Sequence, residues 1–368
     1  MTTLKPLPTG RKTDQYASRD EFLRTAAAFE MARLRSLPFS DENAAALFPQ
    51  AQFEVPIGPT GTGTPSIRFV RVDPSHYVDG LSEPLRDEVL AIGNRNEDVI
   101  RWREMLEVHR RNRVEITYPY FISETYVTNR MFGAFVAETQ YRTAVERYAT
   151  GWLVDANAQW YQGISNDHRH LEWPMSEPDH PVVQVSWFDA MSFAWWLSRR
   201  TGMIFRLPTK EEWTLAARPD ALKDEPCVFP WGNDFGRLEQ RMNFGTAELT
   251  HFAWIHEQYR DGYALTSPVT AFPPSERGLY DVVGNVWSWN WTNDAVYERR
   301  PAANRVATPA HLADLGAGRN ERLTMQGGCY LARVTHTTLF SKMSHPALDG
   351  AVDIGFRLVA VRRADSGL

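Results

Sequence analysis

Polar side chains that could transfer protons or bind anions are concentrated in the segment 326–357, which opens with a diglycine and closes with Gly-Phe-Arg. Arg333, His336, Lys342 and His345 lie between these two ends. Histidine can exchange a proton near neutral pH, and arginine offers a forked donor to carboxylates and phosphates. Glycines allow close backbone approach, so the following residues are displayed from a tight bend. We therefore expect this segment to line a functional groove in which Arg333 and His336 matter most.

Each of these side chains also has a purely structural interpretation. His336 and His345 are nine residues apart, which matches no local metal-ligand spacing, and both could serve only to bond loop carbonyls. Cys329 follows the diglycine and could act in catalysis, yet a lone cysteine is more often a small buried hydrophobic residue. Trp287 and Tyr330 could present aromatic rings to a substrate in the same groove.

The composition argues against several other classes of function. The 368 residues carry a net charge of −5 without a long basic run, so we expect no nucleic-acid partner. No stretch comes near the roughly eighteen apolar residues that a membrane-spanning helix needs, and no signal-peptide pattern opens the sequence. The two cysteines, Cys227 and Cys329, are far apart and predict no disulfide framework. We expect a cytoplasmic protein without a membrane partner.

The elements that must position these residues begin with an N-terminal extension, residues 1–112. Apolar residues at helical spacing predict a helix over 14–36, and Ser40 would cap a second helix. Alternation over 67–72 predicts a strand, and a charged helix is expected within 83–112. The extension should therefore be mainly helical with one strand.

Shorter elements with clear end signals follow from residue 113. A strand is predicted over 113–123, a helix follows it, and a further short strand leads into a second helix after residue 180. Signals that begin helices are Thr128 or Asn129, Ser186 or Asp189, and a capping box of Thr209 with Glu212, whereas Gly202 ends a helix. These signals predict three helices between the extension and the later chain.

After Arg218 the chain is rich in Gly, Pro, Asn and Asp, which predicts long loops closed by a strand over 355–363. The sequence contains 13 tryptophans. We expect most of them to pack irregular loops into a core, with a sugar-binding aromatic surface as the alternative.

Six motifs occur in an order that resembles the formylglycine-generating-enzyme, or sulfatase-modifying factor, superfamily. They are HPVVQVSWFDAMSFAWWLS, FRLPTKEEWTLAAR, FPWG, GLYDVVGNVWSWNW, QGGCYL and IGFRLV. The resemblance covers about residues 113–363 and implies one α+β domain over 113–368, a loop-rich variant of the C-type lectin fold. Residues 1–112 would pack on it as the extension.

The resemblance also implies which chemistry is missing. Members that generate formylglycine use two cysteines of the last motif to bind copper and oxidise a sulfatase cysteine. Ala332 and Thr337 stand at those positions here, and neither supplies the thiolate that Cu(I) prefers. Members that make sulfoxides bind iron in a fused helical bundle, but residues 1–112 contain only His76 and His109, without the required spacing. Copper held by a cysteine pair is therefore not expected, and any catalytic metal stays unassigned.

Two classes of function remain. One is a tailoring enzyme that acts on a small molecule or peptide in the groove, and the resemblance implies an oxidation. A siderophore-maturing oxidase of the family works without the cysteine pair. The other is a non-catalytic module that binds a ligand or protein. For the enzyme, catalytic candidates are His336, Arg333, Cys329 and His345, and substrate-binding candidates are Trp287, Tyr330 and Lys342.

The family often binds structural calcium, and one of its sites matches well. The resemblance assigns this site to the Asn243 side chain, the Phe244 carbonyl, the Asp261 carboxylate and the Tyr263 carbonyl. Calcium accepts such oxygen ligands, and it could tie irregular loops together. We expect this site to be filled.

A second family calcium site matches only in part. Asp281 and the carbonyls of Gly284 and Val286 are present, but Ser288 replaces the glutamate of the family pattern. One strong anionic ligand is thereby lost, so we expect this site to be weaker.

Overall fold

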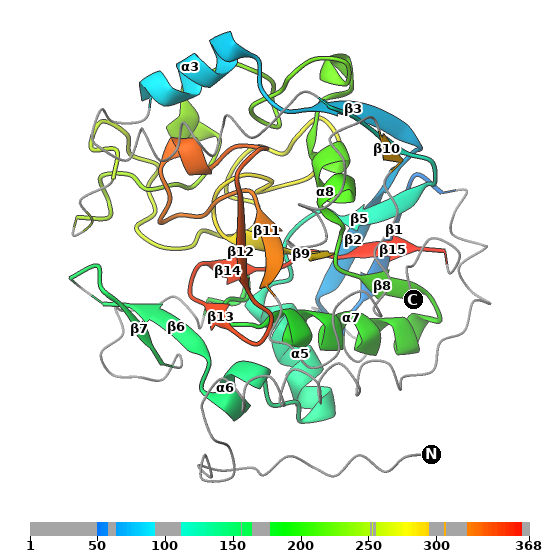
Figure 1. Cartoon of the computed structure of the whole chain (residues 1–368). Helices are drawn as coiled ribbons and strands as arrows, with labels where there is room; N and C mark the ends of the chain where they lie inside the picture. The colour runs from blue at the N-terminus through cyan, green and yellow to red at the C-terminus, as the bar shows by residue number, and fades with distance from the viewer. Residues whose placement is uncertain are drawn as a thin grey trace.

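The structure is a computed structural model, and in the part of the chain that it describes, strands from distant segments form four sheets (Figure 1). The structure describes residues 50–57, 64–92, 112–155, 157–163, 177–250, 252, 255–293, 305–306 and 322–362. The helices predicted over 14–36 and from Ser40, and the sequence EDVIRWREMLEVHRR (97–111) around which the charged helix is expected, lie outside these residues.

The largest sheet joins the predicted extension to the end of the chain. Its order is β1 (Gln52–Pro56), β2 (Ser66–Val72), β5 (Tyr120–Ser123), β15 (Val359–Val361) and β8 (Ile204–Arg206), with antiparallel neighbours throughout. Phe53 and Val55 of β1 are buried while their neighbours are exposed, as expected of a strand with one face on the core. The described part of the extension thus completes a sheet of the later chain.

The other three sheets are smaller. Their orders are β10 (Arg305–Val306), β4 (Asn112–Ile116) and β3 (Ser75–Asp79); β12 (Lys342–Pro346), β11 (Arg322–Gln326), β9 (Trp287–Asn293) and β14 (Ile354–Gly355); and β13 (Gly350–Ala351), β6 (Gly151–Val154) and β7 (Trp160–Gln162). In the last of these sheets, β6 and β7 form an antiparallel hairpin, and β13 pairs with β6 in parallel.

Two predicted strands are each split between sheets. The strand predicted over 113–123 is β4 followed by β5, and Pro119, which has no N–H to donate to a ladder, lies between them. The strand predicted over 355–363 is β14 followed by β15. Between them, the carbonyls of Phe356 and Leu358 accept the backbone N–H groups of Val127 and Ser123, at and just after the end of β5. Alternation along a strand does not show which sheet each half joins.

The helices begin and end largely where the sequence signals them. They are α3 (Glu83–Ile92), α5 (Asn129–Thr139), α6 (Ala144–Tyr148), α7 (Trp187–Thr201) and α8 (Lys210–Ala217), with short 3-10 turns η3 (Asp220–Leu222), η4 (Leu238–Gln240) and η6 (Val334–His336). Thr128 caps α5 and Ser186 caps α7, which settles both alternatives. Gly202 ends α7 in the left-handed region, as predicted. The short strand predicted before α7 is reduced to a single bridge between Thr128 and Pro181.

Loops make up most of the described chain between residues 218 and 286, where η3 and η4 are the elements found. This mixture of short helices, small sheets and long loops is the α+β, loop-rich architecture that the resemblance implied. Among the described helices, none combines the length and the apolar character needed to cross a membrane.

Tryptophans hold these loops together. Trp187, Trp195, Trp289 and Trp291 are completely buried in one large hydrophobic cluster. The indole N–H of Trp187 donates to the Asn290 carbonyl at 2.9 Å, which satisfies its polar group inside the core. These four tryptophans therefore serve as core, as expected, whereas Trp160 is 41% exposed.

One buried ion pair connects β8, α8 and the chain before β5. The Arg206 guanidinium contacts both carboxylate oxygens of Glu212, at 2.7 and 2.8 Å, and both side chains are fully buried. Glu212 also accepts the Thr209 backbone N–H at 2.8 Å and the Tyr118 hydroxyl at 2.9 Å. The predicted capping box is confirmed, and its glutamate also neutralises a core arginine.

Candidate functional site

Register places several predicted site residues across adjacent strands. Gln326, the last residue of β11, pairs with Lys342 of β12 on one side and with Ser288 of β9 on the other. Trp287 precedes Ser288 and pairs with Ile354 of β14. The loop from the diglycine to β12 therefore leaves and re-enters the sheet at the same end.

The diglycine forms the tight bend that the sequence predicts. Gly327 and Gly328 have φ of 95° and 77°, the left-handed region that favours glycine. A Cβ on Gly328 would lie 2.2 Å from the His336 carbonyl oxygen, and one on Gly327 would lie 2.7 Å from the Val282 carbonyl oxygen. The loop thus folds back onto its own bend and against the 281–284 turn.

Arg333 and His336 lie with a buried histidine that the sequence did not single out. Nε2 of His256 accepts the Val334 backbone N–H at 3.2 Å, which leaves the ring proton on Nδ1. His256 is only 1% exposed, whereas Arg333 and His336 are partly exposed. The contact spans 78 residues of sequence, and no motif surrounds His256.

Both imidazoles are neutral at pH 7. Burial, and then the positive Arg333, lower the pKa of His256 to about 4. Burial, Arg333 and His256 lower the pKa of His336 well below its usual range. Neutral rings beside one fixed positive charge can accept a proton and can accompany an anion.

The two positions of the missing thiols are integrated into the local backbone structure. The Ala332 carbonyl accepts the Gly245 N–H at 2.7 Å, and the Thr337 hydroxyl donates to the Val334 carbonyl at 3.0 Å. Thr337 is fully buried, so its hydroxyl stabilises the η6 turn. In the described part of the chain, no group of three or more His, Cys, Asp or Glu side chains is placed to hold a metal.

Cys329 has the environment of a buried thiol. It is 2% exposed, and its Sγ donates to Oδ2 of Asp353 at 3.3 Å. Burial and the Asp353 charge raise the pKa of the Cys329 thiol well above its usual range. The thiolate is the nucleophilic form, so this environment favours the small buried residue over the predicted catalytic thiol. Cys227 is also buried, and both cysteines are free.

The aromatic residues predicted to bind substrate are placed in the core instead of on a groove wall. Trp287 is 3% exposed and Tyr330 is fully buried, and both belong to the large hydrophobic cluster. The Tyr330 N–H donates to the Asn285 carbonyl at 2.9 Å, which ties the loop to the 281–286 turn. Lys342 is partly exposed and remains accessible.

His345 lies in a different environment from His336. It pairs with Leu323, three residues along the strands from the pair formed by Lys342, or about 10 Å away. Nδ1 of His345 is 3.7 Å from an Asp349 carboxylate oxygen, too far for a hydrogen bond. Burial, and then the nearby Arg322, lower its pKa to about 4.

The residues assigned to the first calcium site gather around Asp261. Its carboxylate accepts the backbone N–H groups of Phe244 and Tyr263, each at 2.9 Å. The Asn243 amide nitrogen donates to the Leu265 carbonyl, while its Oδ1 is buried without a hydrogen-bond partner. An unpartnered buried oxygen beside a carboxylate fits a hard-cation site.

The turn of the second calcium site lies directly against Asn243 of the first site. The Asn285 N–H donates to the Asn243 carbonyl at 2.8 Å, and a Cβ on Gly284 would lie 2.3 Å from that oxygen. Asp281 is 6% exposed, and its Oδ1 has no partner. The Val286 carbonyl already accepts the Tyr126 hydroxyl at 2.6 Å. The Asp281 carboxylate thus keeps one oxygen without a hydrogen-bond partner, and the weaker second site stays a prediction.

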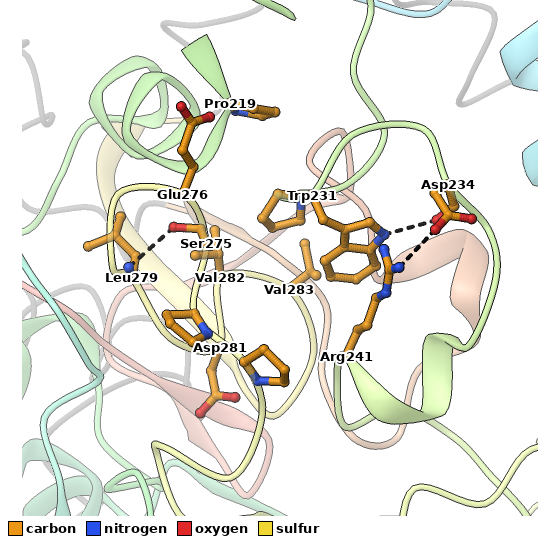
Figure 2. Close-up of a pocket in the computed structure, with 13 residues that line it drawn as sticks. Pro219, Trp231, Asp234, Arg241, Ser275, Glu276, Leu279, Asp281, Val282 and Val283 are labelled. Carbon is orange, nitrogen blue, oxygen red and sulfur yellow. Dashed lines mark hydrogen bonds and ion pairs between the residues drawn. The ribbon is translucent and has the colours of Figure 1, made fainter. Parts of the chain in front are cut away.

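A separate pocket of about 520 Å³ opens beside this turn (Figure 2). Four prolines and Trp231 line it together with the apolar side chains of Leu279, Val282 and Val283. Figure 2 shows the ion pair of Asp234 with Arg241, 2.8 Å long, beside Trp231. None of its 13 lining residues comes from the segment 326–345, so it is distinct from the predicted groove.

Comparisons with known proteins identify the family that the six sequence motifs resemble. A family model described as a sulfatase-modifying factor enzyme 1-like domain matches residues 90–362. A formylglycine-generating enzyme from Thermomonospora curvata is 34% identical over 210 residues, which are 51% of this chain and 65% of that protein, just under two thirds. A formylglycine-generating enzyme from Streptomyces coelicolor is 29% identical over 266 residues, 65% and 77% of the two chains. An inactive C-alpha-formylglycine-generating enzyme 2 from Bos taurus is 32% identical over 238 residues, 57% and 72%.

Two solved structures share the fold. PvdO from Pseudomonas aeruginosa superposes with a TM-score of 0.55 at 20% identity, over 83% of this chain and 98% of that chain. Treponema denticola variable protein 1 superposes with a TM-score of 0.53 at 15% identity, over 84% and 99%. Relatives named as active and as inactive match this chain about equally well, so similarity alone does not assign an activity.

Proposed function

The chain belongs to the sulfatase-modifying factor family, and from this premise we propose that it is a tailoring enzyme that does not generate formylglycine. Its substrate would be a small molecule or peptide bound beside Arg333 and His336. One observation carries the proposal: the family's bend and loop are kept, but Ala332 and Thr337 replace the copper-binding thiols.

The side chains at this site suit an anionic substrate. Arg333 is the charged group that acts on both His256 and His336, and a guanidinium binds carboxylate or phosphate through paired hydrogen bonds. His336 is neutral, and its lowered pKa makes it a weak base, so its part would be to accept a hydrogen bond from a bound substrate. Oxidation is the reaction class that family membership favours, and the chain's own part in it would be to bind and orient the substrate.

Formylglycine formation is the first activity to test. Incubation of a sulfatase-motif peptide with this protein, copper and a reductant should leave the peptide mass unchanged, because no thiolate pair is present to hold Cu(I). The Streptomyces coelicolor formylglycine-generating enzyme, assayed in parallel, is the positive control. Appearance of the aldehyde mass with this protein would contradict the proposal.

Arg333→Ala and His336→Ala should fold with nearly normal melting temperatures and lose ligand binding. Inorganic phosphate is a suitable probe in calorimetric titration, because it offers the oxygens that Arg333 would hold. Arg333→Ala removes one charge-assisted contact, which is worth about 1.5–3 kcal/mol. The dissociation constant of this variant for phosphate should therefore be roughly 10- to 100-fold higher than that of the wild type.

Arg241→Ala is the matched control, since this arginine lies in the separate pocket and pairs with Asp234. Its phosphate affinity should equal that of the wild type. Two results would count against the groove: early melting of both site variants, or a phosphate affinity that does not depend on Arg333.

A non-catalytic binding module is the second candidate. It is favoured by the buried Cys329 thiol and by the lowered pKa values of His336 and His345, which leave fewer reactive groups at the site than the sequence predicted. Metal titration separates the two candidates. Stoichiometric iron or copper with redox activity would support the enzyme, whereas binding of calcium alone would favour the module or a reaction that needs no redox metal.

A further inference from the structure

Helix α3 packs against η6, the turn that carries His336 (Figure 1). We infer that α3 restricts the groove to small molecules, because it covers the turn that a segment of another protein would have to reach. The inference rests on the proposed function and narrows its substrate class from small molecules or peptides to small molecules.

The helix is attached by an apolar face. Leu85, Val89 and Ile92 follow at intervals of four and three residues and therefore share one side of α3. Val89 is fully buried and belongs to the same hydrophobic cluster as Val334 of η6, while Leu85 and Ile92 pack against that cluster. The apolar side of α3 is thus used to cover η6 and its surroundings.

The strand before α3 fixes its position. Val78 of β3 donates its N–H to the Lys223 carbonyl at 2.9 Å. Asp79 pairs with Lys210 of α8 at 3.0 Å, with both side chains largely buried. A helix that starts directly after such an anchored strand cannot swing far from η6.

Most of α3 precedes the part of the chain that the family model matches. That match begins at residue 90, and Glu83 to Val89 lie before it. Chemistry on a protein-borne residue needs room for a polypeptide next to η6 and the positions of Ala332 and Thr337. Here α3 takes up space on η6, while the side chains of Arg333 and His336 stay partly exposed and can reach a ligand.

Thiol labelling tests this inference in the full chain. His336→Cys places a reporter on η6, and native Cys227 and Cys329 are buried and should react slowly. N-ethylmaleimide and a maleimide on a long polyethylene glycol chain share one reactive group but differ in size. We expect the ratio of the small to the large reagent's rate to be at least about tenfold higher at position 336 than for Glu88→Cys on the exposed side of α3.

Detaching α3 should remove this size selectivity. Leu85→Glu puts a charge on the packed face and should lower the ratio at position 336 by about tenfold or more, because the opened state becomes more populated. Asp87→Ala, on the exposed face, should leave it unchanged. Near-ultraviolet circular dichroism checks folding, and Leu85→Ser replaces Leu85→Glu if the latter does not fold.

Two results would overturn the inference. One is modification of position 336 by the large reagent as readily as by the small one while α3 is intact, and the other is a ratio that stays high after α3 is detached. Labelling requires neither a ligand nor turnover. The labelling test can therefore contradict the inference while phosphate still binds through Arg333, and it can support the inference even if phosphate does not bind.

Discussion

Replacing Glu212 by alanine should lower the free energy of unfolding by about 3–5 kcal/mol, the cost of leaving a buried charge without its partner. Arg206 would remain fully buried with neither carboxylate oxygen to pair with. The Thr209 N–H and the Tyr118 hydroxyl would lose their acceptor in the same step. Guanidinium unfolding, followed by tryptophan fluorescence, measures the change.

Two variants show whether burial causes the loss. Glu212→Gln keeps the shape and the acceptor oxygen but removes the charge, so it should fall between the wild type and Glu212→Ala. Arg130→Ala breaks the exposed ion pair between Arg130 and Asp179, in which the two side chains are 46% and 65% exposed. This variant should change the unfolding midpoint little. Equal stability of wild type and Glu212→Ala would show that the pair contributes nothing net.

Calcium should raise the melting temperature of the wild type, and Asp261→Ala should abolish this response. A ligand that binds only the folded state at a hundred times its dissociation constant stabilises it by about 2.7 kcal/mol. Asp261 and the unpartnered Asn243 oxygen are the ligands on which this expectation depends. Asp281→Ala should reduce the response less, because the second site is weaker.

The calcium response should depend on pH in a defined direction. Burial, the largest cause, raises the pKa of Asp261 to about 6, and calcium binds the deprotonated carboxylate. Stabilisation by calcium should therefore be present above about pH 6 and fade as the pH falls through that value. Without calcium, the contribution of Asp261 to stability changes with pH in the opposite direction. Because the folded-state pKa is raised, this contribution is fully present below the unfolded pKa of about 3.9 and is lost as the pH rises through 6.

Melting curves recorded between pH 4 and 8, with calcium and in calcium-free buffer, test both signs. Asp261→Ala should give curves that calcium does not separate at any pH. If the wild-type protein also melts identically with and without calcium at pH 7.5, the proposed site does not bind the ion.

The family and the helix ends could be predicted because they depend on neighbours in the sequence. Ser186 and Gly202 bound α7, and Thr209 with Glu212 caps α8, through contacts a few residues long. The diglycine bend was equally local, since only glycine fits its backbone angles beside so close a carbonyl. The loss of the thiol pair needed no structure at all.

Tertiary structure decided which of the predicted site residues share an environment. His256 joins Arg333 and His336 through a contact across 78 residues, and no sequence pattern encodes such a distance. Trp287, Cys329 and Tyr330 have the chemistry of site residues, but packing places them in the core. Periodicity predicts that an apolar face will be buried and does not name its partner, so only the folded chain shows α3 lying on η6.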